Sequence, residues 1–364
     1  MSIDAAGFRY PLLHIDIQKL KTNLAVLSAS VKRAGCSLMI VTKSFCADEE
    51  IVRMLAASPQ VDYLADSRIQ NLRRCAGRGK PAVLLRLPQP CEIEDVVSYA
   101  DISLNSEPDT LALLNAEAGR QRKRHKVILM IDLGDLREGL YFTENEKILK
   151  TAEAVVGMPN LCLYGLGVNL TCYGAVIPKK DNLSILASWA DSICGHCGID
   201  LPVVSGGNSS SFYLIDKGEL PPGINNLRLG EAFIVGREAA YKQRIKDTFD
   251  DAVTLEAQII EVQTKPSVPV GETGVDAFEG KPSFEDRGLL KRAICAVGRQ
   301  DIEISGIVPQ DPGVEILGAS SDHLILNISA SRQNYTVGGT IRFIPNYSAL
   351  LRLFTSAYIG RVYE

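Results

Sequence analysis

Short apolar runs alternate with amphipathic segments over the first two-thirds of the chain. Eight runs have the composition of buried strands: Leu38–Thr42, Asp62–Ala65, Ala82–Leu85, Ile102–Leu104, Val127–Asp132, Leu163–Asn169, Pro202–Ser205 and Leu227–Leu229. Segments with helical spacing of apolar residues lie between them: Asp48–Ala57, Ser67–Ala76, Glu92–Ala100, Pro108–Ala118, Glu144–Val156 and Asn182–Cys197. Strands that alternate with helices indicate a parallel sheet, and eight such strands close a barrel. We therefore predict an α/β fold that begins with a (β/α)8 barrel, with an open doubly wound sheet as the alternative.

From about residue 247 the pattern changes. Stretches such as "DAVTLEAQIIEVQTKP" and "YTVGGTIRFIP" are rich in β-branched residues, and Gly, Pro and Asp separate them. Short strands with such turns are typical of a mostly antiparallel sheet. We predict a barrel domain at residues 1–246 and a smaller β domain at residues 247–364.

The composition of the chain excludes some classes of binding partner and favours one cellular compartment. The net charge is −4 with no basic block or acidic tail, so we expect neither nucleic acid nor a membrane surface as a partner. The first residues, "MSIDAAGFRY", lack a signal-peptide pattern, and no apolar run approaches the ~20 residues that span a bilayer. The nine cysteines show no disulfide framework, which favours reduced thiols in the cytoplasm. Cys194 and Cys197 lie in a helical segment without a second pair, and we predict no metal site.

Unusual residues stand where the predicted barrel strands end, which is where barrel enzymes place their active sites. They are Lys43 after the first run, Arg137 after the fifth, Asn169 at the end of the sixth, "GGNSSS" after the seventh, and Arg228 in the eighth with Gly230 behind it. Each alone has an ordinary reading, as a surface lysine, a capping loop or an ion-pair arginine. Glycines and a helix start after strands seven and eight commonly hold phosphate. A lysine at the same rim then suggests a phosphorylated carbonyl compound bound as a Schiff base.

These and other stretches resemble the alanine racemase-type family of pyridoxal-phosphate enzymes, and among them the ornithine racemase branch. The resemblance is carried in order by "VTKSFCAD", "LADSRIQNL", "ADISLNSEPDT", "MIDLGDLREG", "GVNLTCYGAVIP", "SGGNSSS", "GINNLRLGEAFIVGRE", "DAFEGKPSFEDRGLLKRAICAVGRQDI" and "LGASSDHLIL". It extends over nearly the whole chain. It implies a cofactor-binding barrel followed by a β domain, with pyridoxal 5'-phosphate as the cofactor.

The resemblance also implies roles for single residues. Lys43 forms the Schiff base with the cofactor and acts as one acid/base group at Cα of the substrate. The cofactor-binding residues are Lys43, Arg137 near the phenolic oxygen, Asn169 against the ring, Arg228 at the pyridine nitrogen, and Asn208, Ser209, Gly230, Glu231 and Tyr358 around the phosphate. A guanidinium group only donates hydrogen bonds, so Arg228 requires an unprotonated ring nitrogen. Such a ring is a weaker electron sink, which suits prompt return of the proton.

The chain departs from the family pattern at the second acid/base group. Family members use a tyrosine from the partner subunit's β domain, whereas the matching stretch here, "AVGRQDI", has Arg299. Arginine effectively never deprotonates, so Arg299 is a poor base. Either Arg299 holds the substrate carboxylate or another residue is the base; His323, Cys46, Tyr173 and Tyr347 are unranked candidates. Our substrate-binding candidates are Arg299, Asp301, Asp322 and His323, and a homodimer is implied.

The expected function is racemisation of ornithine or a similar diamino acid by proton exchange at Cα. The second ammonium group of such a substrate needs an acid near it. Acids near the predicted site are Asp135, Glu138, Asp276, Glu285, Asp286 and Asp301. The alternatives are an alanine or broad-specificity racemase, a decarboxylase, aldolase or dehydratase of the same fold, and a non-catalytic carrier of the cofactor. The predicted β domain disfavours the carrier.

Overall fold

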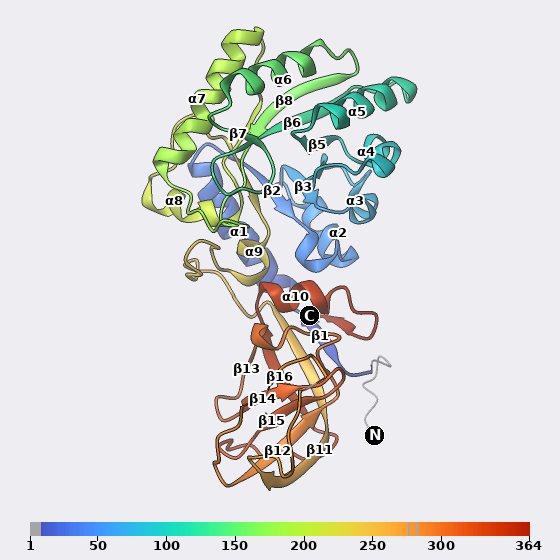
Figure 1. Ribbon diagram of the computed structural model, residues 1–364, viewed down its shortest axis with the longest axis vertical. Coiled ribbons are helices and arrows are strands. Elements are labelled where there is room, and N and C mark those ends of the chain that lie inside the picture. Colours follow the sequence, from blue (N-terminus) through green and yellow to red (C-terminus); the bar gives the residue numbers. More distant parts are fainter. Residues whose placement is uncertain (1–8, 276, 282) are drawn as a thin grey trace. The chain divides into compact units, whose positions relative to one another are not determined.

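The chain forms two compact units in the computed structural model, which describes residues 9–275, 277–281 and 283–364 (Figure 1). One unit is Lys19–Phe249, and the other combines Asp250–Glu364 with the described residues up to Gln18. The N-terminal segment joins the second unit because strand β1 (Leu12–Ile15) pairs with β11 (Val253–Pro266) and β17 (Gly360–Tyr363). The sequence-based division after residue 246 had assigned this segment to the barrel.

The Lys19–Phe249 unit is a closed barrel of parallel strands. In the described part of the chain its eight strands are β2 (Ser37–Val41), β3 (Tyr63–Asp66), β4 (Ala82–Leu84), β5 (Ile102–Asn105), β6 (His125–Asp132), β8 (Leu161–Gly167), β9 (Val203–Ser205) and β10 (Asn226–Leu229). The ring closes through the pairs β10–β2 and β5–β6. Each predicted apolar run overlaps one of these strands, so the barrel is confirmed and the open sheet is wrong.

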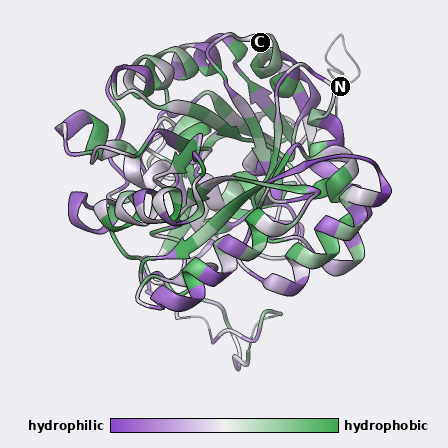
Figure 2. Cartoon of the chain, turned by 90° about the horizontal axis from the view of Figure 1, so that it is seen from above, coloured by the Kyte–Doolittle hydropathy of each residue, from purple (hydrophilic) through white to green (hydrophobic). Residues whose placement is uncertain are grey.

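Helices surround the barrel. They are α1 (Ile17–Arg33), α2 (Glu49–Ala57), α3 (Ile69–Cys75), α4 (Ile93–Tyr99), α5 (Pro108–Arg120), α6 (Asn145–Gly157), α7 (Lys180–Cys197), α8 (Phe212–Lys217) and α9 (Glu231–Val235). The six predicted helices correspond to α2–α7, whereas α1 was not predicted. Local signals fix their starts: Asp48 accepts a hydrogen bond from the Ile51 backbone N–H at 3.2 Å, and Pro108 opens α5. In Figure 2 the barrel strands are mostly green and the helices around them alternate between green and purple.

Apolar side chains fill the inside of the barrel: Met39, Val41, Ala65, Val83, Ile102, Leu104, Ile128, Met130 and Val203. Glycines make room where strands press together. A Cβ at Gly165 would lie 2.1 Å from the Val203 carbonyl oxygen, and one at Gly167 would lie 3.0 Å from Met130 Sδ. The Gly167 position also leaves space for the Arg228 side chain, whose Nη1 would be 3.5 Å from that Cβ.

The other unit is a mostly antiparallel sheet. Besides β1, β11 and β17 it contains β12 (Leu289–Cys295), β13 (Ile307–Pro309), β14 (Glu315–Ala319), β15 (Leu324–Asn327), β16 (Thr340–Pro345) and the helix α10 (Tyr347–Leu353). The strands follow the order β13-β16-β11-β12-β15-β14, and β1 pairs in parallel with β17. This confirms the predicted β domain. Among the described residues no helix combines the length and apolar character needed to cross a membrane.

Candidate active site

Lys43 lies directly after β2, at the C-terminal end of the barrel strands. It opens a short 3-10 turn, Lys43–Phe45, and the next two residues have left-handed backbones, with φ of 51° at Cys46 and 46° at Ala47. Such angles are unfavourable for residues other than glycine and persist where surrounding contacts enforce them. The half-buried Lys43 therefore stands in a turn whose conformation its neighbours fix.

A buried carboxylate at the end of β3 supplies those contacts. Asp66 accepts hydrogen bonds from Thr42 Oγ1 at 2.6 Å and Asn71 Nδ2 at 3.1 Å. Asn71 Oδ1 in turn accepts from Cys46 Sγ at 3.6 Å. Burial raises the pKa of Asp66, against the lowering effect of its hydrogen bonds and of the Lys43 charge. One carboxylate thus fastens the chain on both sides of Lys43.

Arg228 is the third residue of β10 and is only 2% exposed. Its guanidinium group donates to Ser205 Oγ at 2.5 Å, to the Val168 carbonyl at 2.6 Å and to Asn169 Oδ1 at 2.7 Å. Burial lowers the pKa of Arg228 to about 10, an effect that the nearby Glu138 opposes. These three acceptors are neutral, so the buried cation lies in a site suited to an additional acceptor or anion.

Asn169, after β8, continues this chain of polar contacts. Its Nδ2 donates to Glu138, and Glu138 accepts from both Nε and Nη2 of Arg137. The Glu138 side chain is 14% exposed and that of Arg137 is 37% exposed. The hydrogen-bonded residues, called the polar chain below, run from Arg137 through Glu138, Asn169 and Arg228 to Ser205. They connect the ends of β6, β8, β10 and β9, so Arg137, Asn169 and Arg228 lie in one hydrogen-bonded set at the rim.

Asp135 has a different task from the one the sequence suggested. It is fully buried and accepts backbone N–H hydrogen bonds from Cys172 at 3.2 Å, Tyr173 at 2.9 Å and Val176 at 3.2 Å. These bonds hold the loop after β8 in place. The oxygens of Asp135 are therefore engaged within the protein rather than open to a substrate ammonium group.

The loop after β9 has the features of an anion site. Ser209 is buried, and its Oγ accepts from the backbone N–H groups of Gly230 at 3.3 Å and Ala232 at 3.0 Å. Asn208 orders the same loop by accepting from the Ser210 N–H at 2.8 Å and donating to the Leu170 carbonyl at 3.0 Å. A hydroxyl group and the backbone donors at the start of α9 therefore converge, as at other phosphate sites. The Glu231 side chain points to Lys242 instead, at 2.8 Å.

Gly230 brings this loop against the strand that leads to Lys43. A Cβ at Gly230 would lie 3.0 Å from Val41 Cβ and 3.2 Å from the Val41 carbonyl oxygen. A side chain at this position would require Val41 to shift by a few tenths of an ångström. The donors of the Ser209 loop, the lysine and the buried guanidinium form a set that fits pyridoxal 5'-phosphate, which carries a phosphate, an aldehyde and a ring nitrogen acceptor.

The remaining predicted residues belong to the Asp250–Glu364 unit. Tyr358 is 67% exposed. The Arg299 guanidinium lies over the Phe278 ring at 4.5 Å, and its Nε donates to the Ala319 carbonyl at 3.0 Å. Asp301 is buried and accepts from Ser356 Oγ at 2.6 Å. The other contacts are Asp322 with Ser321 Oγ at 2.6 Å, His323 Nδ1 with Ser320 Oγ at 3.3 Å, and Asp286 with the Gly288 N–H at 3.0 Å. Glu285 is exposed, and Asp276 lies outside the described residues.

Two carboxylates were missed or misjudged at the sequence level. Asp66 was quoted within "LADSRIQNL" without a role, although a carboxylate at the end of a buried parallel strand is a usable signal. Glu138 was considered only as an acid for the substrate, whereas it links Arg137 to Asn169.

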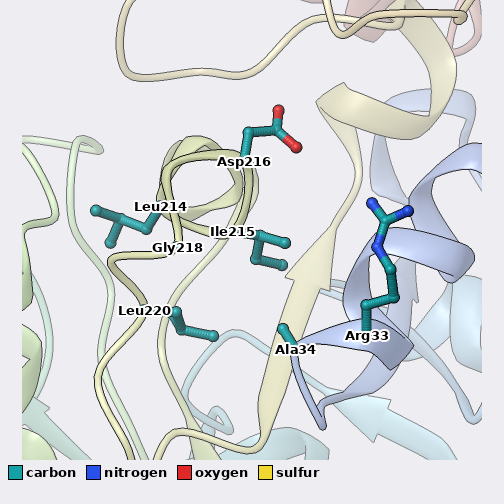
Figure 3. Close-up of a pocket in the computed structure, with 7 residues that line it drawn as sticks. All are labelled: Arg33, Ala34, Leu214, Ile215, Asp216, Gly218 and Leu220. Carbon is teal, nitrogen blue, oxygen red and sulfur yellow. The ribbon is translucent and has the colours of Figure 1, made fainter.

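A cavity of about 330 Å³ lies elsewhere on the barrel (Figure 3). It is lined by Arg33, Ala34, Leu214, Ile215, Asp216, Gly218 and Leu220. These residues precede β2 and β10, so the cavity is on the side of the strand N-termini. None of the predicted site residues lines it. Barrel enzymes act at the opposite rim, and we assign the chemistry there.

Comparison with known proteins gives consistent results. Residues 15–237 match the family model described as the N-terminal domain of alanine racemase. The chain is 53% identical over 352 residues to an ornithine racemase from Acetoanaerobium sticklandii, covering 97% of this chain and 99% of that protein. It is 38% identical to a lysine racemase from Thermotoga maritima, covering 98% and 99%. The solved structure of alanine racemase from Clostridium difficile shares the fold, with a TM-score of 0.71, 18% identity, and 97% and 95% of the two chains covered.

Proposed function

The chain belongs to the alanine racemase family, and from that premise we propose that it interconverts the enantiomers of a diamino acid, ornithine before lysine. It is a pyridoxal-phosphate-dependent amino-acid racemase. The proposal that ornithine is the substrate rests on the 53% identity to an ornithine racemase over nearly the full length of both proteins. The match to a lysine racemase supports the same substrate class, because lysine and ornithine both carry a terminal ammonium group.

The residues at the rim would hold the cofactor as follows. Lys43 would carry it covalently, and Asn208, Ser209 and the backbone at Gly230 and Glu231 would take the phosphate, with Tyr358 as a further phosphate contact. Arg228 would donate to the ring nitrogen, Asn169 would lie against the ring, and Arg137 would lie at the phenolic oxygen. When bound, pyridoxal phosphate withdraws electrons from Cα of the attached amino acid and so acidifies its C–H bond.

The protein's own residues then move the proton. The amine of Lys43 takes or returns the Cα proton on one face of the substrate. Asp66, through Thr42, Asn71 and Cys46, holds the Lys43 turn, so the amine starts from a fixed position. Arg228 can only donate a hydrogen bond and would therefore require an unprotonated ring nitrogen.

The opposite face of Cα requires a second group, and we propose that a homodimer supplies it. The resemblance implies that Arg299 of one copy reaches the other copy's site, where it would hold the substrate carboxylate. Asp301, Asp322 and His323 are the accompanying candidates for the distal ammonium group and for the second base. Coexpression of Lys43→Ala with Arg299→Ala tests this arrangement. A shared site restores activity in the mixed dimer, whereas a fully active monomer in sedimentation refutes it.

A cytoplasmic location is also proposed. All nine cysteines are free thiols in the structure, which suits a reducing compartment.

A racemisation panel tests the substrate. Loss of optical rotation is followed for L-ornithine, L-lysine, L-arginine, L-alanine and L-serine with the holoenzyme. We expect ornithine to give the highest kcat/KM, with lysine next. Lys43→Ala should abolish turnover, while Lys150→Ala, an exposed lysine on α6, should behave like the wild type. Equal turnover of alanine and ornithine would contradict the diamino-acid assignment and leave the racemase intact.

A further inference from the structure

Glu138 links Arg137 to Asn169 in the polar chain, and the proposed mechanism assigns it no role. It accepts hydrogen bonds from Nε and Nη2 of Arg137 and from Nδ2 of Asn169. Asn169 in turn accepts from Arg228 at 2.7 Å. One carboxylate on the loop after β6 thus connects, directly or through one residue, the three side chains expected around the cofactor ring.

These contacts fix the orientation of the Asn169 amide. An amide has an acceptor end and a donor end. Arg228 only donates and so requires the Oδ1 end, while an ionised Glu138 only accepts and so requires the Nδ2 end. Without Glu138, the donor end of Asn169 loses the partner that defines its direction.

Glu138 also balances charge in a cation-rich site. Charged and titratable neighbours of Arg137 and Arg228 are Glu138, Cys172 and, for Arg137, Asp135. The oxygens of Asp135 are taken by three backbone N–H groups. Among the contacts described for these residues, Glu138 is the carboxylate that bonds directly to a guanidinium group of the site. Lys43, in the turn after β2, lies at the same rim and adds a further amine.

We propose that Glu138 is a positioning residue of the racemase that orients Asn169 and Arg137 toward the cofactor and offsets the positive charge around it. The proposal rests on the proposed function, in which pyridoxal phosphate is held among these residues. Positive surroundings favour the deprotonated form of a bound group. Removing the Glu138 charge therefore lowers the pH at which the absorbance of the bound cofactor changes.

Two variants separate charge from contact. Glu138→Gln keeps the size of the side chain but turns one acceptor into a donor facing Arg137, and Glu138→Asp keeps the charge. Glu117→Gln is a matched control, because Glu117 on α5 is 15% exposed and is held by two hydrogen bonds from Arg120, at 2.7 Å each. Each protein is loaded with pyridoxal phosphate and its absorbance is titrated with pH. The affinity of the apoprotein for the cofactor and its unfolding temperature are measured alongside.

We expect Glu138→Gln to shift the absorbance titration down by about one pH unit, the order expected for a charge removed from a partly buried site. Its kcat should fall roughly 10- to 100-fold through misplacement of Asn169 and Arg137. In Glu138→Asp the absorbance should change at nearly the same pH as in the wild type. Glu117→Gln should match the wild type in both the pH of the absorbance change and kcat.

An unchanged titration and kcat in Glu138→Gln would overturn the proposal, as would an equal shift in Glu117→Gln. A wild-type protein that acquires no chromophore with pyridoxal phosphate would instead overturn the proposed function. If Glu138→Gln does not fold, the titration of Arg137→Gln decides. Loss of the Arg137 cation should raise the pH at which the cofactor absorbance changes. If that pH does not rise, the proposed role of charge balance is wrong.

Discussion

Asp66 holds the Lys43 turn through hydrogen bonds, and substitutions of Asp66 can show whether its hydrogen-bonding pattern or its negative charge is responsible. In Asp66→Asn, the remaining oxygen can accept from the Arg68 N–H and Asn71 Nδ2, as Oδ1 of Asp66 does at 2.8 Å and 3.1 Å. The new amide group then faces Thr42 Oγ1. That hydroxyl also lies 3.3 Å from the Ala65 carbonyl and can donate there while accepting from the amide. Every hydrogen bond of the turn is thus conserved.

Asp66→Ala, in contrast, removes all of the acceptors. The Asn71 amide and the Arg68 N–H lose this partner, and each unsatisfied buried donor costs about 1–3 kcal/mol. The Thr42 hydroxyl can still donate to the Ala65 carbonyl. The desolvation of a buried carboxylate is relieved at the same time, so we expect a net loss of roughly 2–4 kcal/mol for Asp66→Ala. For a barrel of this size that is a decrease of roughly 5–12 °C in unfolding temperature. Asp66→Asn should stay within about 1 kcal/mol of the wild type.

The pH dependence has a definite sign. Because burial raises the pKa of Asp66, the folded state binds this proton more tightly than the unfolded state. The contribution of Asp66 to stability is therefore greatest at low pH and decreases as the pH rises from the ordinary carboxyl range through the raised pKa. Relative to the wild type, Asp66→Asn should become more stable as the pH rises through that range.

The assay is calorimetric unfolding of the apoprotein at a series of pH values, with wild type, Asp66→Asn and Asp66→Ala compared. Borohydride labelling of Lys43 in the loaded proteins reports whether the turn still presents the amine. If Asp66→Asn is as unstable as Asp66→Ala at neutral pH, the charge rather than the hydrogen-bonding shape holds the turn, and the reasoning fails.

Three further predictions concern the cofactor site. Reduction of the holoenzyme with borohydride and peptide mapping should place the pyridoxyl group on Lys43, and a label on another lysine would contradict the assignment. Gly230→Ala should weaken cofactor binding about 10-fold or more in a fluorescence titration, because its Cβ would lie 3.0 Å from Val41 Cβ, whereas Gly195→Ala, with open space around it, should not. Arg228→Lys should lower kcat roughly 100-fold and leave the affinity of the apoprotein for inorganic phosphate nearly unchanged. An ammonium group cannot reproduce the planar contacts of the guanidinium group to Ser205, Val168 and Asn169. A wild-type kcat in this variant would refute the prediction.

The architecture was predictable where the pattern is local. Parallel barrel strands are buried on both faces and therefore appear as short continuous apolar runs, and all eight were found in this way. Strand β1 and helix α1 were missed. The pairing partners of β1 lie in β11 and β17, beyond the whole barrel, and no local signal reveals such contacts.

The site was predictable in the residues that end strands but not in the contacts between them. Lys43, Asn169 and Arg228 follow from their positions along the chain, because the C-terminal ends of parallel strands meet at one rim. The tasks of Asp135 and Glu138 do not follow. Whether a carboxylate meets water, a backbone N–H or a guanidinium group depends on neighbours from other strands, which the sequence near it does not contain.

The pairing of β1 with β11 and β17 has a consequence for biosynthesis. Strand β1 leaves the ribosome before the barrel, and its two neighbours, β11 and β17, leave after the barrel. The barrel is thus an uninterrupted insertion within the β unit and can fold during translation, whereas β1 cannot pair fully until β17 has been synthesised. A nascent chain that has not reached Gly360 therefore leaves one edge of β1 unpaired and open to other chains until β17 has been made.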